Sequence, residues 1–131
     1  MKPGDVLFHK DYKFDDGGTS DKLLIVLAPA PPHEVMVVLT TSQQHRRELR
    51  DGCHTNPGQS YFTFNANPGG FKKATWVLLT PRLMFVRALE LKMSSGQVKP
   101  VQSLRDTDLR AVVNCLKKSD DVSPYHLSLL K

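Results

Sequence analysis

Cysteine and long apolar segments are both scarce in this sequence of 131 residues. The two cysteines, Cys53 and Cys115, lie far apart and form no CxxC pair, which excludes a disulfide framework and a four-ligand zinc site. We therefore expect two thiols, Cys53 in a loop or at a strand edge and Cys115 in the core, and a reducing, cytoplasmic environment. The longest apolar run, residues 23–28, is far below the ~20 residues that cross a bilayer, and the N-terminal segment lacks the apolar core of a signal peptide.

Sequence motifs for several classes of enzyme are missing as well. There is neither a GxSxG nucleophile motif nor a GxxxxGK[ST] phosphate-binding loop. The five histidines show no HxH, HExxH or i, i+4 pairing, so the sequence predicts no metal site and no cofactor, although distant histidines can still meet in a fold. The adjacent Cys53 and His54 do not place a thiolate and an imidazole for catalysis.

The charge is distributed unevenly along the chain. The formal net charge is +5, with 18 Lys and Arg against 13 Asp and Glu. Residues 45–99 carry nine basic and three acidic side chains, whereas residues 1–21 carry three basic and five acidic ones. A basic middle permits a polyanionic partner such as nucleic acid and does not by itself require one.

Short apolar runs separated by turn residues predict a mostly β protein. The two longest runs, residues 22–27 and 35–39, predict buried strands that pair as a hairpin at the centre of a sheet. The polar segment 10–21 contains Asp15-Asp16-Gly17-Gly18 and predicts a loop, because these residues favour turn conformations. Further strands are expected over residues 6–8, 61–64, 75–79 and 83–86, with a half-exposed strand over 89–93 and turns at 67–70 and 94–96.

One clear helix is expected late in the chain. Ser103 and Asp106 have the spacing of a capping box, and apolar residues then recur on one helical face. A short terminal helix is expected from Ser123-Pro124 to Leu130. The predicted fold is one domain over residues 1–131, mostly β (α+β), with a helix packed against the sheet. The helical face consists of Leu109, Val112, Val113 and Leu116.

Several of these features occur in an order typical of one family. A Gly-Asp-Val-Leu-Phe start precedes a glycine-bearing loop, a buried strand headed by a basic residue, a buried strand ending in two threonines, and a Gly-x-Val turn before the late helix. Over roughly residues 3–118 this order resembles the PemK/MazF family of toxins from toxin–antitoxin modules. The segments concerned are residues 4–8, 15–20, 22–27, 37–42 and 96–98.

The resemblance implies a fold, an activity and partners. The implied fold is a small SH3-like β-barrel with a C-terminal helix, and the implied assembly is a homodimer. The implied activity is cleavage of single-stranded RNA without a metal, through attack of the 2′-hydroxyl on the neighbouring phosphorus. The implied protein partner is a cognate antitoxin that neutralises the toxin.

The resemblance also assigns residues. Lys22 stands where the family places an arginine, and Thr40 stands where it places a threonine, with Thr41 beside it. Lys22 would supply positive charge and a proton, and Thr40 would donate its hydroxyl to a phosphate oxygen. The family's substrate groove is bordered by the loop before Lys22, which an antitoxin can displace; here it contains Asp15, Gly17, Gly18 and Ser20. Basic residues expected to contact the RNA backbone are Arg46, Arg47, Arg50, Lys72 and Lys73.

Alternatives remain for each of these assignments. Lysine lacks the bidentate fork of arginine, and Leu79-Thr80 stands where a typical member has an Asp-Gln step. A non-catalytic module that binds nucleic acid or protein on the same barrel is therefore the second hypothesis. Lys22 can also be a strand-edge side chain, and Thr40 a strand-end hydroxyl bonded to backbone. The aromatic residues of the strand-like runs, expected in the core rather than stacked on bases, are Tyr61, Phe62, Phe64 and Trp76.

Overall fold

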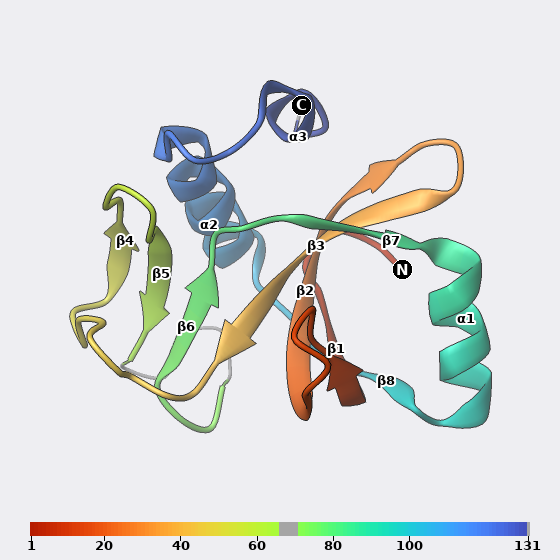
Figure 1. The fold of residues 1–131 in the computed structure, drawn as a ribbon. Coiled ribbons are helices and arrows are strands. Elements are labelled where there is room, and N and C mark those ends of the chain that lie inside the picture. The colour runs from red at the N-terminus through yellow and green to blue at the C-terminus, as the bar shows by residue number, and fades with distance from the viewer. Residues whose placement is uncertain (66–70, 131) are drawn as a thin grey trace.

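The computed structural model describes residues 1–65 and 71–130 and shows a curved antiparallel sheet with three helices in that part of the chain (Figure 1). The strands follow in the spatial order β4-β5-β6-β3-β2-β1-β8, and β7 pairs with β3. The elements are β1 (Asp5–Lys13), β2 (Thr19–Ala30), β3 (Glu34–Thr41), β4 (Gly52–His54), β5 (Tyr61–Phe64), β6 (Thr75–Leu78), β7 (Arg82–Phe85), α1 (Val86–Ser95), β8 (Val98–Ser103), α2 (Asp106–Lys118) and α3 (Pro124–Ser128).

The predicted central hairpin is confirmed by β2 and β3. Ile25 lies opposite Val38, and Leu24 lies opposite Leu39. Residues 24–28 and 35–41 are all buried, as expected for strands covered on both faces. On its other edge β2 pairs with β1, where Val6 lies opposite Ile25.

The second edge of β3 is divided between two partners. Near the start of β3, Val37 lies opposite Arg82 of β7, whereas at its end Thr40 lies opposite Val77 of β6. The change of partner separates the β4–β5–β6 group from the rest of the sheet, as Figure 1 shows. Among the described strands β4 and β8 lie at the two ends of the order, so the sheet is not closed into a barrel.

The core lies on both faces of the sheet. Neighbouring residues of β2 alternate, so that Ile25 faces one apolar cluster and Leu24 faces the other. Helix α2 covers the first cluster with Val112 and Leu116, and α1 covers the second with Leu89. The predicted helical face, the terminal helix and the burial of Tyr61, Phe62, Phe64 and Trp76 are all confirmed. None of the described helices is long and apolar enough to span a membrane.

The half-exposed strand predicted over residues 89–93 is wrong, because these residues belong to α1. The alternation of Leu89, Leu91 and Met93 suggested a period of two, yet Leu91 is 62% exposed. Val86, Leu89 and Met93 instead follow the helical spacing i, i+3, i+7, and they pack together against the second cluster. Most of the segment consists of strong helix formers, and Gly96 ends the helix with φ 84°.

Three further local predictions need correction. Ser103 does not cap a helix, because it ends β8 and its hydroxyl donates to Asp5 Oδ1 at 3.1 Å. Strand β8 itself was not predicted, since Pro100 interrupts its apolar pattern; the sheet tolerates this proline at its edge. The loop expected over residues 10–21 is mostly strand, and only its centre forms a turn between β1 and β2. The turn predicted over residues 67–70 lies outside the described residues.

The expectation of two free thiols is wrong. Cys53 of β4 and Cys115 of α2 form a disulfide across a sequence separation of 62 residues. Sequence spacing could not show this pairing, because it depends on α2 packing against β4 and β5. The argument for a reducing environment rested on unpaired cysteines and therefore loses its basis, so a cytoplasmic location stays a prediction.

Breaking this disulfide should destabilise the protein without changing its fold. A cross-link over a loop of this length restricts the unfolded chain, and its loss typically costs roughly 2–4 kcal/mol. We expect the double variant Cys53→Ala/Cys115→Ala to lose about that much free energy of unfolding in guanidinium titrations. In excess thiol reductant the wild type should match the variant. Two reactive thiols in the denatured, unreduced protein would contradict the disulfide.

Candidate functional site

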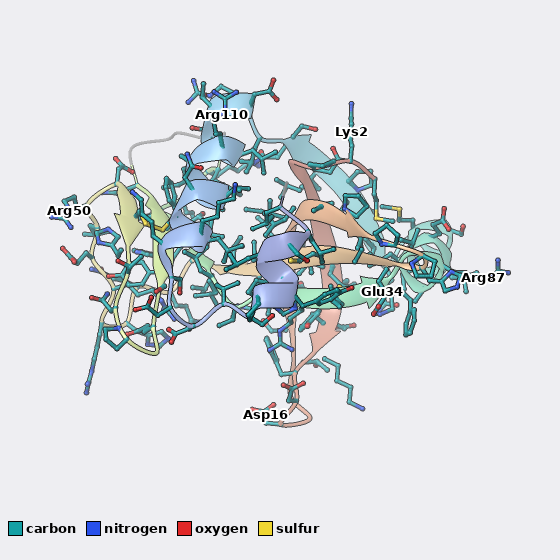
Figure 2. The ribbon with its side chains drawn as sticks, turned by 90° about the horizontal axis from the view of Figure 1, so that it is seen from above. Lys2, Asp16, Glu34, Arg50, Arg87 and Arg110 are labelled. Atoms are coloured by element: carbon teal, nitrogen blue, oxygen red, sulfur yellow. A yellow bond between two sulfur atoms is a disulfide. The ribbon has the colours of Figure 1, made fainter. Side chains whose placement is uncertain are left out.

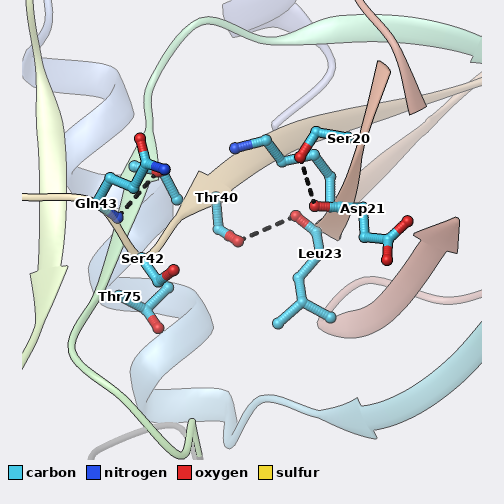
Figure 3. Close-up of a pocket in the computed structure, with 9 residues that line it drawn as sticks. Ser20, Asp21, Leu23, Thr40, Ser42, Gln43 and Thr75 are labelled. Carbon is cyan, nitrogen blue, oxygen red and sulfur yellow. Dashed lines mark hydrogen bonds between the residues drawn. The ribbon is translucent and has the colours of Figure 1, made fainter. Parts of the chain in front are cut away.

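A pocket of about 180 Å³ opens where β2 begins and β3 ends (Figure 3). It lies at the point where β3 changes its partner to β6. The two strands bring together residues that are 17 or more positions apart in the sequence, including the predicted Lys22, Thr40, Thr41 and Ser20. The described residues that line it are Ser20, Asp21, Lys22, Leu23, Thr40, Thr41, Ser42, Gln43 and Thr75.

Lys22 is the cation of this pocket. Its side chain is half-buried, and its Nζ atom lies 5.7 Å from the centroid of the Phe14 ring. Burial lowers the pKa of Lys22 below its ordinary value, and the positive charge of Arg47 lowers this pKa further. Arg47, also predicted from the sequence, therefore acts electrostatically on the pocket although it does not line it.

The two threonines present their hydroxyls differently. Thr40 is 3% exposed, and its hydroxyl donates to the Leu23 carbonyl oxygen at 3.1 Å. This is the backbone-bonded arrangement expected for a structural strand-end threonine, and Figure 3 shows it spanning the two strands. The Thr41 hydroxyl oxygen accepts from the Gln43 backbone N–H at 3.1 Å, which leaves its own O–H to serve as a donor.

The segment that carries Arg47 is fixed by its neighbour Glu48. The Glu48 backbone N–H donates to the Tyr61 hydroxyl at 2.9 Å, and the Glu48 carbonyl accepts from Trp76 Nε1 at 2.9 Å and from the Thr63 hydroxyl at 3.1 Å. These bonds attach residues 43–51 to β5 and β6 despite their loop-like composition. Arg47 itself donates to the Gln43 carbonyl at 3.1 Å, and in the described part of the chain its Nε is buried without a hydrogen-bond partner.

A second hollow of about 500 Å³ adjoins the pocket and shares Leu23, Ser42 and Thr75 with it. Lys72 and Lys73, both exposed and both predicted to contact RNA, line this hollow. None of the described residues that line it is acidic, and the apolar ones are Leu23, Phe71 and Val101. We refer to the pocket and this hollow together as the basic groove.

Other predicted residues lie outside the basic groove. Asp15, Gly17 and Gly18 form the tip of the β1–β2 hairpin. Gly17 has φ 90°, a backbone conformation that residues with a side chain rarely adopt. Arg50 lies at the outer edge of the molecule, on the opposite side from α1 (Figure 2), and pairs with Glu48 at 3.8 Å. Arg46 is exposed on the same segment as Arg47.

The sequence did not single out Ser42, Gln43, Thr75 or Asp21 as site residues. Only Ser42 carried a signal, because it continues the threonine pair at the strand end. Asp21 is the one acidic residue among the described residues that line the pocket. Its carboxylate accepts from the Asp11 backbone N–H at 3.0 Å and points away from Thr40 and Ser42 (Figure 3). Among its described residues the pocket thus holds a lysine and several hydroxyls, while the carboxylate of Asp21 is turned away from Thr40 and Ser42.

Comparison of the chain with protein families, with curated proteins and with solved structures finds no match.

Neutralising Arg47 should raise the pKa of Lys22. The arginine disfavours a second positive charge nearby, so Arg47→Gln removes a repulsion and favours the protonated lysine. The measurement is an NMR titration of the Lys22 side chain in both proteins. Arg46→Gln is the matched control and should leave the titration unchanged. A Lys22 pKa that stays the same in Arg47→Gln would show that the two side chains do not interact.

Proposed function

We propose that the protein is an endoribonuclease that cleaves single-stranded RNA without a metal, as the resemblance to PemK/MazF toxins implies. The observation that supports this proposal is that Lys22, Thr40 and Thr41 line one pocket, next to a hollow lined by Lys72 and Lys73. The resemblance selects Lys22 and Thr40 by sequence order, and the pairing of β2 with β3 brings them into one pocket.

The proposed chemistry is an internal transfer at phosphorus. The 2′-hydroxyl oxygen forms a bond to the adjacent phosphorus and loses its proton to water, while the bond to the 5′ oxygen breaks. Lys22 donates a proton to that leaving oxygen, which a lowered pKa makes easier. The Thr41 hydroxyl donates to a phosphoryl oxygen as negative charge develops there. The Thr40 hydroxyl donates to a phosphoryl oxygen as well, once its hydrogen bond to the Leu23 carbonyl oxygen has broken. The products are a 2′,3′-cyclic phosphate and a 5′-hydroxyl.

The same proposal includes the remaining properties of the family. The chain would act as a homodimer in the cytoplasm, with its open sheet as a variant of the family's SH3-like barrel, and a cognate antitoxin would neutralise it. The hairpin tip formed by Asp15, Gly17 and Gly18 projects from the sheet beside Lys22, near the labelled Asp16 in Figure 2, and an inhibitor could displace it.

Cleavage of single-stranded RNA in excess chelator should depend on the pocket. We expect Lys22→Ala to lower the cleavage rate about a hundredfold, the usual effect of losing a general acid, and Thr40→Val to lower it about tenfold or more. Lys117→Ala, an exposed change on α2, is the control and should cleave like the wild type. Absence of cleavage in chelator, or wild-type rates in both pocket variants, would overturn the assigned mechanism.

A second candidate function is binding of single-stranded RNA without cleavage. It is favoured by the hydrogen bond that occupies the Thr40 hydroxyl and by the carboxylate of Asp21, which is turned away from the pocket. The exposed lysines of the basic groove would still hold phosphates in such a protein.

Binding to a cleavage-resistant 2′-deoxy oligonucleotide should weaken with salt and depend on Lys72 and Lys73. Each released counterion contributes ~0.7 to the slope of log affinity against log salt for a single strand, so Lys72→Gln or Lys73→Gln should reduce the slope by about that amount. Arg87→Gln, on α1 at the far side of the molecule in Figure 2, should leave it unchanged. Equal slopes in all four proteins would remove the lysines from the interface.

A further inference from the structure

A hollow of about 350 Å³ lies between the end of β1, strand β7 and helix α1. None of its described lining residues is shared with the basic groove. Each of the three elements contributes one cation to it, namely Lys13, Arg82 and Lys92, and none of the described residues that line it is acidic. Small-molecule pockets have volumes of ~300–1,000 Å³, so the hollow has room for a small organic anion.

Lys92 is held in this hollow by a neutral partner. Its Nζ atom lies 3.2 Å from His9 Nε2, and His9 Nδ1 lies 3.0 Å from the Lys10 carbonyl oxygen. Because a carbonyl only accepts, Nδ1 carries the ring hydrogen and Nε2 accepts from the ammonium. His9 is 2% exposed, and burial, with a further contribution from the charge of Lys92, holds the pKa of His9 below its ordinary value. The neutral ring therefore positions the ammonium without compensating its charge.

Tyr12 adds a hydroxyl to the same hollow. The residue lines the hollow and is only 7% exposed, yet no hydrogen bond joins its hydroxyl to another described residue. Its ring packs edge to face on His9, with 5.3 Å between the centroids, and on Phe14, with 5.4 Å between the centroids. The Tyr12 ring and the Lys92 ammonium are thus neighbours of one imidazole. A largely buried tyrosine usually finds a partner for its O–H, and an anion in the hollow would supply one.

The rest of the wall is apolar. Leu89 of α1 is fully buried, whereas Phe85 of β7 is 61% exposed and forms the outer side of the hollow. Aliphatic and thioether side chains suit a saturated chain, whereas a nucleotide base would need exposed aromatic faces for stacking. The wall and the cations together match a molecule with an apolar chain and an anionic head. The apolar lining residues are Leu83, Met84, Phe85, Ala88 and Leu89.

Arg82 already has one carboxylate nearby. Its Nη1 atom lies 3.7 Å from Asp15 Oδ1, and the Asp15 side chain is 91% exposed. Such an exposed pair contributes little to stability, and a guanidinium carries five N–H donors, so Arg82 can also serve a ligand carboxylate while Asp15 stays in place. In the described part of the chain, Lys13 and Lys92 form no ion pair.

We propose that this hollow binds a medium-chain aliphatic carboxylate, a molecule of the fatty-acid type. The carboxylate accepts hydrogen bonds from the Lys92 ammonium and the Tyr12 hydroxyl, while Arg82 and the exposed Lys13 add positive charge around it. The alkyl chain lies on the apolar wall of β7 and α1. The site is independent of the proposed RNA cleavage, because it uses none of the residues of the basic groove.

The test measures binding of octanoate by isothermal titration calorimetry, below the concentration at which octanoate forms micelles. The wild type should bind octanoate at least about tenfold more tightly than octanol, which lacks the charge, and the affinity should rise about threefold per methylene from hexanoate to octanoate. Lys92→Met should lower the affinity about tenfold, and Tyr12→Phe, which removes only the hydroxyl, about fivefold. Lys117→Met, which removes an exposed charge from α2, is the matched control and should bind like the wild type.

Several outcomes would overturn the proposal. These are no binding of octanoate, equal affinities for octanoate and octanol, an affinity that does not rise from hexanoate to octanoate, or equal losses in Lys92→Met and Lys117→Met. Sedimentation with phosphatidylglycerol vesicles that requires Lys92, without binding of free octanoate, would assign the hollow to a lipid surface instead. If circular dichroism shows that Lys92→Met does not fold, Tyr12→Phe and Arg82→Gln decide the question by the same criteria.

Discussion

The pairing of β3 along both of its edges is the constraint on which the rest of the structure depends. One edge pairs with β2, and the other is shared between β7 and β6. A strand in this position is covered on both faces, which is why Val35–Thr41 are all buried. The transfer from β7 to β6 leaves a pocket at the end of β3, and there the hydroxyls of Thr40 and Thr41 meet Lys22 from β2. The candidate site is thus a consequence of sheet topology.

Much of the strand pattern could be predicted because continuous apolar runs identify strands that are buried on both faces. The pairing of residues 22–27 with 35–39 followed directly from two such runs. The strand predicted over residues 89–93 was wrong because a window of five residues cannot distinguish strand alternation from a helical face that includes Val86. Strand β8 was not predicted because an edge strand is only half covered and tolerates Pro100, which interrupts its apolar pattern. Short segments are decided by what packs on them, which sequence alone does not show.

Some residues of the candidate site could likewise be predicted from the sequence, and others could not. Lys22 and Thr40 could be named because the order of elements resembles a family that places a cation at the head of one buried strand and a threonine at the end of the next. Arg47 could be named only as one of several basic residues. Its position depends on the hydrogen bonds that Glu48 forms with Tyr61, Thr63 and Trp76. The disulfide was out of reach for a similar reason: it joins β4 to α2 only because both pack on the same core.

Two partly buried lysines connect the basic groove to the hollow between β1, β7 and α1. Lys22 lines the basic groove, and Lys92 lines that hollow. In the described part of the chain neither Lys22 nor Lys92 forms an ion pair, and a partly buried charge without a counter-charge costs stability. Such a cost is typical of positions that act on a ligand. His9, which binds Lys92, lies directly opposite Lys22 in the β1–β2 ladder, where side chains of facing residues are about 5 Å apart. Lys22 and the hydrogen-bond partner of Lys92 therefore face each other across two neighbouring strands, so that the β1–β2 ladder connects the two basic sites.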